Sequence, residues 1–337
     1  MMGRKIDNNR FLYLDIFKAL AVFLVILGHA PGCNLSVKQI IYSFHMPAFF
    51  AAYGIAYDAD KHSRSGFINC NFMINKTIRL LLPYTFWGII YLHLNVNIKT
   101  LAYLLYGNQR SLIMAESLSS LWFLPCMFLS VCLFEFLAGL QVLLSPIKML
   151  AAVVILVSIN LALPLVKLGY PWSFNTMFLA VSFIISGYFV KKYFLTLLSD
   201  NYIVLGISTA FSILLLLMLY RLNLKNINLR NVDMASNTVG NIFLYYSCAL
   251  CGIIFLLGLS IILSRYVYIY IIYIAFMGRH TMTIFLLHKP LVIYLSQVLK
   301  NHYFVASLIT VCFICALLYN LNYLRTSIDL LLRGKRK

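Results

Sequence analysis

The segment from Phe11 to Gly32 constrains the fold most, because it is apolar enough to cross a bilayer yet carries three ionisable side chains. At about 100° per residue, Asp15, Lys18 and His29 share one stripe of a helix. The rise from Lys18 to His29 is about 16 Å, roughly half the hydrocarbon thickness. A charge at bilayer depth costs at least about 2.5–3.5 kcal/mol, so such residues normally face a partner or a wet cavity. Asp15 and Lys18 alternatively form an ion pair that only eases insertion.

Apolar runs of membrane-spanning length recur along the whole chain, which is 62% hydrophobic and 11% charged. This composition predicts an all-α, polytopic membrane bundle that forms one domain over residues 1–337. We expect about ten spans, near 11–30, 37–57, 80–94, 119–140, 147–166, 174–190, 202–220, 239–263, 281–299 and 304–324.

Basic residues set the predicted orientation. With the N-terminus in the cytoplasm, cytoplasmic segments hold seventeen Lys and Arg and external segments hold eight. The positive-inside rule then places both termini in the cytoplasm. The net charge of +18 is therefore a topology signal and not evidence for nucleic acid. We expect the first span to be retained, since its length and charges do not fit a signal peptide.

Further polar residues mark the ends of the next spans. Pro47 is typical of a helix start and would place His45 at the outer mouth of the second span. Lys76 and Arg79 share a face at the inner end of the third span. They are either snorkelling residues or a site for a phosphorylated donor. Trp122, at the start of the fourth span, fits an interfacial belt residue.

The C-terminal third holds a second group of charged and histidine residues. His288 and Lys289 lie inside an apolar run, about two turns past Arg279. Pro290 interrupts this helix, which is tolerated where neighbours bond the freed carbonyl. Tyr266 to Ala275 is expected to be a short interfacial segment.

The polar loop 221–238 and two Cys-x-x-Cys pairs are interpreted as structural features. In the basic loop 221–238, Asp233 and Asn237 are expected to be solvated, although the loop is alternatively a binding surface. The pairs Cys248/Cys251 and Cys312/Cys315 lie inside apolar spans and are interpreted as core residues, so no metal is expected.

These motifs, taken in order, resemble the integral-membrane acyltransferase-3 family, and within it stand-alone sugar O-acetyltransferases similar to fucose 4-O-acetylase. The resemblance covers nearly the whole chain and is carried by five motifs: Asp15-Ile-Phe-Lys18 with Gly28-His29, Phe44-His45-Met46-Pro47, Arg79-Leu-Leu-Leu-Pro83-Tyr84, Leu121-Trp122-Phe123-Leu124-Pro125, and Gly278-Arg279-His280-Thr281 with Leu287-His288. The family usually has Arg where this chain has Lys18 and Lys76; Lys keeps the charge but lacks the planar fork of Arg.

The resemblance implies an O-acetyltransferase with acetyl-CoA as donor and a surface polysaccharide or its lipid-linked precursor as acceptor. It implies a multi-pass location in the bacterial cytoplasmic (inner) membrane, contact with membrane lipid, and possible glycan-assembly partners. His29 would be the catalytic residue, and Asp15 and Lys18 on its stripe are expected to be catalytic with it. Lys76 and Arg79 would contact the donor. The expected supporting residues are His45, Trp122, Arg279 and His288.

Two alternatives to an acyltransferase remain open at this point. The first is a secondary transporter or flippase for an envelope sugar-lipid. Such folds usually show paired interrupted helices in two halves, and the charged first span has no counterpart five spans later. The second is a non-catalytic membrane module, which does not explain a histidine aligned with two intramembrane charges.

Overall fold

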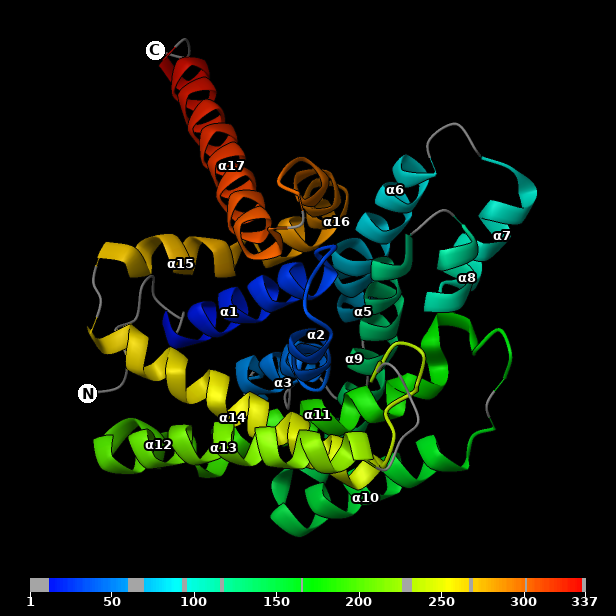
Figure 1. Ribbon diagram of the computed structural model, residues 1–337, viewed down its shortest axis with the longest axis vertical. Coiled ribbons are helices and arrows are strands. Elements are labelled where there is room, and N and C mark those ends of the chain that lie inside the picture. Colours follow the sequence, from blue (N-terminus) through cyan, green and yellow to red (C-terminus); the bar gives the residue numbers. More distant parts are fainter. Residues whose placement is uncertain are drawn as a thin grey trace.

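The computed structural model describes residues 12–59, 70–92, 96–115, 118–164, 166–225, 232–266, 269–300 and 302–334. Within these ranges the chain is helical and has no strand, apart from an isolated bridge between Asp233 and Thr238. The predicted all-α bundle is confirmed (Figure 1). The basic residues before residue 12 and those at positions 335–337 lie outside the described ranges.

Seven helical stretches in the described ranges are long and apolar enough to cross a membrane, and each coincides with a predicted span. They are α1 (Leu12–His29), η2 with α9 (Leu118–Trp122, Phe123–Gly139), η4 with α11 (Pro171–Ser173, Phe174–Tyr193), α13 (Tyr202–Lys225), α14 (Ile242–Tyr266), α16 (Thr281–Val298) and α17 (Tyr303–Gly334). The total of ten spans and the orientation of the termini stay predictions.

The other three predicted spans are short or interrupted helices. They correspond to α2 with α3 (Leu35–Tyr42, His45–Ala56), to α5, η1 and α6 (Cys70–Lys76, Thr77–Leu81, Leu82–Tyr91), and to α10 (Pro146–Ala162). A proline explains each of the two interruptions, the break between α2 and α3 and the π-turn η1. Pro47 lies in the first turn of α3, where a backbone N–H has no helical acceptor. Pro83 has no N–H for the Arg79 carbonyl, and the π-turn η1 holds Arg79.

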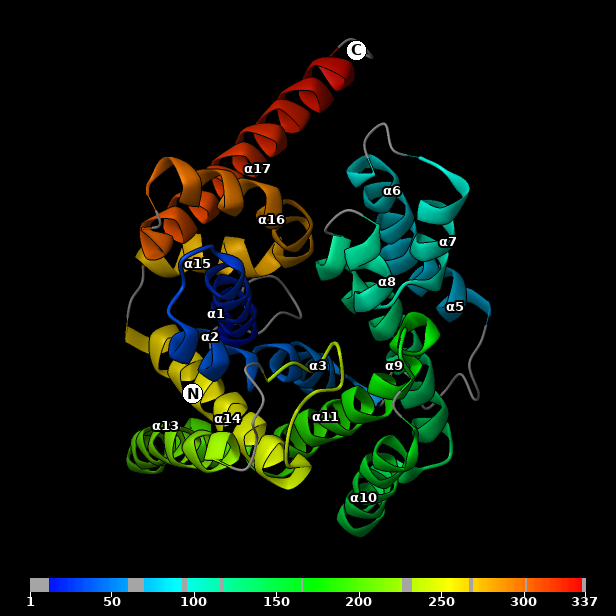
Figure 2. The ribbon, with the colours of Figure 1, turned by 45° about the vertical axis from the view of Figure 1, so that its right-hand side comes forward.

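Helix α1 runs through the middle of the bundle, with α3, α14, α15 (Ile269–Arg279) and α16 packed around it (Figures 1 and 2). Its side chains Phe17, Val22 and Val25 have no exposed surface. Gly278 of α15 lies against the backbone of Asp15, where an added Cβ would stand 1.8 Å from the carbonyl oxygen. The segment expected at the interface is therefore a helix that contacts the central helix directly.

Helices α3 and α11 cross just as closely. A Cβ on Gly54 would lie 1.9 Å from the Ile184 carbonyl oxygen, and one on Gly187 would lie 2.2 Å from the Ala51 oxygen. Because glycine has no side chain, the backbones of α3 and α11 can touch directly at these two positions. The position of α3, and of His45 at its start, is thus set by contact with α11.

The outer helices expose apolar side chains where a bilayer would cover them. On α13, the exposed residues recur at helical spacing and form one face: Ile203, Ile207, Phe211, Leu214 and Met218. An apolar surface of this length is expected of a helix facing lipid. Cys248 and Cys251 are buried as predicted, whereas Cys312 is exposed on α17, so its predicted core position is wrong.

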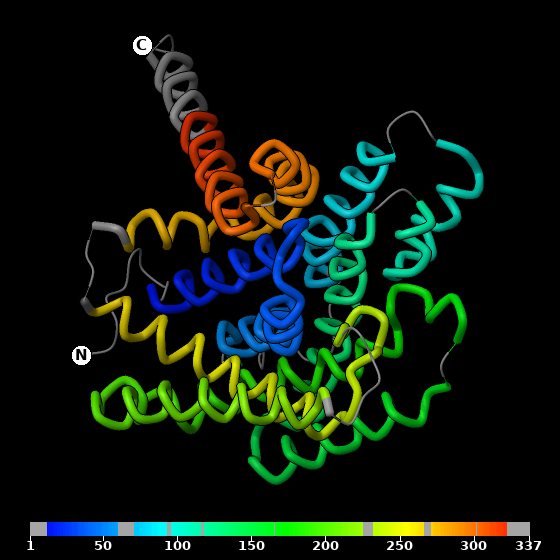
Figure 3. Tube along the Cα trace, in the orientation of Figure 1, coloured from blue at the N-terminus to red at the C-terminus, as the bar shows by residue number. Residues whose placement is uncertain are grey.

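The segment between α13 and α14 turns back into the bundle. Figure 3 shows residues 232–241 leaving the α13–α14 pair and turning toward α9 and α8 (Gln109–Met114). Asp233 and Thr238 exchange two backbone hydrogen bonds of 2.9 Å, and Val232, Met234 and Val239 are buried. The described part of the 221–238 loop is therefore packed, and its expected solvation is wrong.

Candidate active site

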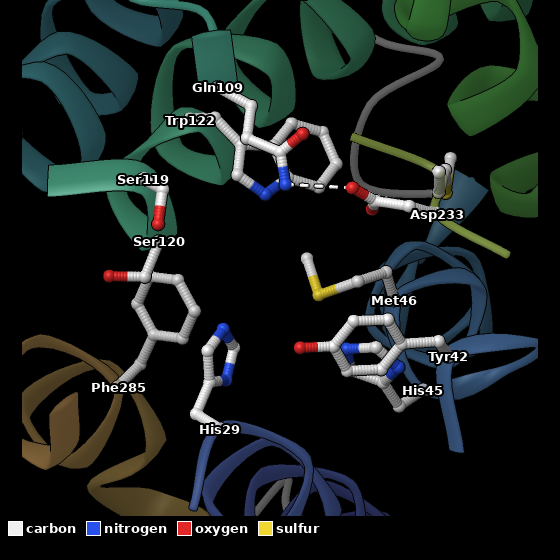
Figure 4. Close-up of a pocket in the computed structure, with 11 residues that line it drawn as sticks. His29, Tyr42, His45, Met46, Gln109, Ser119, Ser120, Trp122, Asp233 and Phe285 are labelled. Carbon is white, nitrogen blue, oxygen red and sulfur yellow. Dashed lines mark hydrogen bonds between the residues drawn. The ribbon is translucent and has the colours of Figure 1, made fainter. Parts of the chain in front are cut away.

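Five regions of the chain meet around one small polar cavity (Figure 4). It lies among the end of α1, the α2–α3 junction, the start of α8 with η2, the 232–241 segment and α16. Its lining residues are His29, Tyr42, His45, Met46, Gln109, Ser119, Ser120, Trp122, Asp233, Met234 and Phe285. The cavity measures about 30 Å³, room for water but not for a sugar ring.

His29 is the last residue of α1, and the helix backbone fixes which ring nitrogen carries its proton. Its Nδ1 lies 2.8 Å from the Val25 carbonyl oxygen. A carbonyl only accepts, so Nδ1 donates and Nε2 keeps its lone pair. His29 is half-buried and lines the cavity. This arrangement is the one a general base requires: a neutral imidazole with a free acceptor nitrogen and an oriented ring.

Two more histidines are held in the same way. His45 Nδ1 lies 2.8 Å from the Ile41 oxygen, and His288 Nδ1 lies 2.6 Å from the Phe285 oxygen. At the break between α2 and α3, the Ile41 carbonyl accepts the Phe44 N–H at 3.1 Å and the His45 ring in addition. Both rings are almost fully buried, at 4% and 0% exposure. Each of the three imidazoles therefore keeps Nε2 as an acceptor.

Aromatic contacts tie these rings together. The His29 and His288 ring centroids are 5.2 Å apart, and those of Tyr42 and His45 are 4.9 Å apart. Tyr42 is also 6.2 Å from His29, and its hydroxyl donates to the Gly28 carbonyl at 3.3 Å. The structure thus brings together three histidines that are far apart in the sequence and that were singled out there.

Helix α16, which carries His288, contains a proline, and a neighbouring helix supplies the hydrogen bond that the proline cannot make. Pro290 has no N–H to donate to the Leu286 carbonyl, and the Tyr91 hydroxyl of α6 donates to that oxygen instead. The expectation that a neighbour would bond the freed carbonyl is confirmed. Beside it, the Lys289 ammonium donates to Ser119 Oγ at 2.7 Å, which places a positive charge at the edge of the cavity.

Asp15 and Lys18 are not among the residues that line the cavity. Lys18 Nζ lies 2.7 Å from Asp15 Oδ1, so the two form the i, i+3 ion pair that the sequence offered as an alternative. Arg279 is exposed at the end of α15 and is likewise not part of the lining. The stripe on α1 therefore has an ion pair near its start and the candidate base at its end.

Lys76 and Arg79 lie at the other end of α3. The Lys76 ammonium is 4.6 Å from the ring centroid of Tyr53. Tyr53 is eight residues, or about 12 Å, along α3 from His45. Arg79 is exposed on η1. Neither of the two described cavities includes Lys76 or Arg79 in its lining.

Near Lys76 lies a carboxylate that sequence reasoning did not single out. Tyr53 and Tyr57 donate to the two oxygens of Glu135, at 3.2 and 3.0 Å. Lys76 therefore sits in an ordered polar cluster and is not a freely snorkelling side chain, whereas Arg79 presents its guanidinium to the surroundings.

Sequence reasoning missed several cavity residues. Tyr42, Gln109, Ser119 and Asp233 line the cavity together with the predicted residues. Trp122, one of the expected supporting residues, is 5% exposed and lines the cavity, so it is buried and does not face lipid as a belt residue would. One signal was present for Asp233: it is an acidic residue in an otherwise basic loop of a chain with only nine Asp and Glu.

A bundle of membrane-spanning helices with an oriented histidine on a polar cavity defines a class of protein: multi-pass membrane proteins with a polar site inside the bundle. A family model described as an acyltransferase domain, Acyl_transf_3, matches residues 11–320, so the chain belongs to the acyltransferase-3 family of membrane proteins. The family match favours a membrane acyltransferase over a transporter or flippase. No curated protein and no solved structure matches the chain.

Proposed function

We propose that this acyltransferase moves an acetyl group from acetyl-CoA to a hydroxyl of a cell-surface polysaccharide or of its lipid-linked precursor. The observation that carries the proposal is the hydrogen bond between His29 Nδ1 and the backbone of its own helix. Its Nδ1–H is committed to the Val25 carbonyl, and its free Nε2 belongs to a side chain that lines a polar cavity. A base of this kind activates hydroxyl groups, and hydroxyl groups are what a glycan offers.

In the proposed reaction, His29 Nε2 removes the proton of the acceptor hydroxyl. At the same time the hydroxyl oxygen bonds to the acyl carbon of acetyl-CoA. The bond between that carbon and sulfur breaks, and His29 returns the proton to the departing thiolate. The backbone bond to Val25 keeps the ring in place through both transfers. The Lys289 ammonium at Ser119 supplies positive charge near the negative charge that develops.

The donor would approach from the Lys76–Arg79 end of α3. The exposed guanidinium of Arg79 suits the phosphates of coenzyme A, which it can bind through two parallel hydrogen bonds. His45, Phe49 and Tyr53 recur every four residues and form one stripe of α3, from the cavity to Lys76. The acyl arm would follow this stripe. The Asp15–Lys18 ion pair would stabilise the start of the central helix, on the side of the membrane from which the donor enters.

The proposal is tested by the ester-linked acetyl content of surface glycans in a host strain that lacks the gene and is complemented with variants. His29→Ala should give no more acetyl than the deletion strain at equal protein level, whereas His302→Ala, an exposed histidine outside the cavity, should restore it. Full acetylation with His29→Ala would show that His29 is not the general base. Unchanged acetyl content after deletion of the gene would reject the proposed function itself.

A further inference from the structure

The side of the cavity opposite His29 is formed by a carboxylate and an amide that no motif brought together. Gln109 Nε2 donates to Asp233 Oδ2 at 2.8 Å, and Figure 4 shows this pair across the cavity from His29. The two residues are 124 positions apart in the chain. Both residues line the cavity that the ring of the candidate base also lines.

Asp233 retains hydrogen-bonding capacity after its structural bonds are counted. Oδ1 accepts from the Ala235 N–H at 3.0 Å, and Oδ2 accepts from Gln109 and from Ser236 Oγ at 3.2 Å. A carboxylate offers about four lone-pair sites, which leaves one. The Gln109 amide oxygen is a further acceptor beside it. Two adjacent acceptors match a ligand that presents two neighbouring O–H donors.

The electrostatics of the pair also favour a hydroxyl ligand. Burial raises the pKa of Asp233, although its hydrogen bonds and the Lys38 charge act in the opposite direction. The described residues contain no group of three His, Cys, Asp or Glu that could hold a metal ion. A neutral O–H group can bond this buried carboxyl group in either protonation state, without bringing a second charge into the site.

We infer that Asp233 and Gln109 bind a second hydroxyl of the acceptor, next to the one that is acetylated, and so restrict the acceptor to polyhydroxylated rings. This inference rests on the proposed function and assigns it an acceptor subsite. The indole of Trp122 lines the same cavity and provides an apolar surface for the C–H face of such a ring. Because the cavity is smaller than a sugar ring, the elements around it must separate when the acceptor enters.

The test measures release of free thiol from acetyl-CoA by purified protein at increasing concentrations of the host's surface polysaccharide, after alkali has removed its O-acetyl esters. Asp233→Asn keeps an oxygen for the Ala235 N–H but loses the carboxylate. We expect its half-saturating polysaccharide concentration to rise by about tenfold or more, with the KM for acetyl-CoA within twofold of wild type. Gln109→Met should shift the same parameter by about threefold.

Ser236→Ala is the matched control, because Ser236 bonds the same carboxylate oxygen but does not line the His29 cavity. It should leave the half-saturating concentration unchanged. If Ser236→Ala raises it as much as Asp233→Asn does, Asp233 only fastens the loop and the inference is overturned. An unchanged value in both Asp233→Asn and Gln109→Met overturns it as well. Failure of the proposed function looks different: wild-type protein then shows no polysaccharide-dependent thiol release.

Discussion

His288 meets His29 edge to face, with 5.2 Å between the ring centroids, and its Nε2 is buried without a hydrogen-bond partner among the described residues. Both rings donate through Nδ1 to backbone carbonyls, so their Nε2 atoms are acceptors and cannot bond to each other. If His29 takes a proton as proposed, it becomes a donor beside an unused acceptor. A buried acceptor left unpaired in the resting state would in this way be satisfied during the reaction.

Replacing His288 with Phe keeps a ring against Phe285 but removes the acceptor nitrogen. We expect kcat for acyl transfer to fall by about 10²-fold, the lower range for acid–base groups, with both KM values little changed. His280→Phe is the control, because His280 packs on Phe276 and does not line the cavity. Equal kcat values in the two variants would show that His288 acts only as a packing residue.

Arg79→Glu tests the donor end of α3. Reversal of an exposed charge that binds phosphate should raise the KM for acetyl-CoA by about tenfold, equivalent to about 1.4 kcal/mol, and the increase should shrink in high salt. The acceptor concentration at half-saturation should not change. Lys148→Glu reverses another exposed basic residue that is predicted to be cytoplasmic, and it should leave the KM unaltered. A similar KM increase in both variants would indicate a general surface-charge effect.

The crossing of α3 and α11 predicts a stability difference between two glycine substitutions. Gly54→Ala places a Cβ against the Ile184 carbonyl and should destabilise the fold by about 1–3 kcal/mol or more. Gly206→Ala, on the lipid-facing helix α13, meets nothing within 4 Å and should stabilise it by up to about 1 kcal/mol. Apparent unfolding temperatures in detergent measure both. A Gly54→Ala variant as stable as wild type would contradict the close crossing.

The bond from Tyr91 to Leu286 predicts a rescue. Tyr91→Phe leaves the Leu286 carbonyl without its donor and should cost about 1–3 kcal/mol of stability. Adding Pro290→Ala restores a backbone N–H for the same carbonyl, so the double variant should recover most of the lost unfolding temperature. If the double variant is as unstable as Tyr91→Phe alone, the phenol has another role.

Asp233 predicts a pH dependence of stability. Its pKa is raised in the folded state, chiefly by burial, while bonds from Gln109, Ala235 and Ser236 and the charge of Lys38 lower it. The folded protein thus holds this proton more tightly than the unfolded chain, and stability falls as the pH rises from the unfolded pKa to the raised one. The Asp233→Asn variant has no proton to lose at this position. The unfolding temperature of wild type relative to Asp233→Asn should therefore increase as the pH is lowered from 8 to 4.

Local sequence patterns predicted the parts of the site that depend on one helix. The apolar length of the first span predicted the central helix, and it placed His29 at the end of that helix, where His29 lines the cavity. Pro47 marked the start of the helix that carries His45, and Pro290 marked the carbonyl that needed a donor. The i, i+3 spacing of Asp15 and Lys18 offered the ion pair that the structure contains.

The rest of the site depends on pairing across the chain, which local patterns do not encode. Nothing near Asp233 indicates that Gln109 is its partner, and nothing near Trp122 distinguishes a belt residue from a buried one. The approach of α15 to α1 requires Gly278 to meet Asp15, a contact between opposite ends of the sequence. Such contacts follow from helix packing and not from periodicity.

The dimensions of the cavity have a consequence for idle turnover. A space of about 30 Å³ next to the His29 ring has room for water but not for a sugar ring. Under the proposed function, water carries the same O–H group that His29 would activate, so an acetyl-CoA thioester that waits without an acceptor would be open to hydrolysis. A glycan that displaces this solvent as it enters would suppress the wasteful reaction by the same movement that starts the useful one.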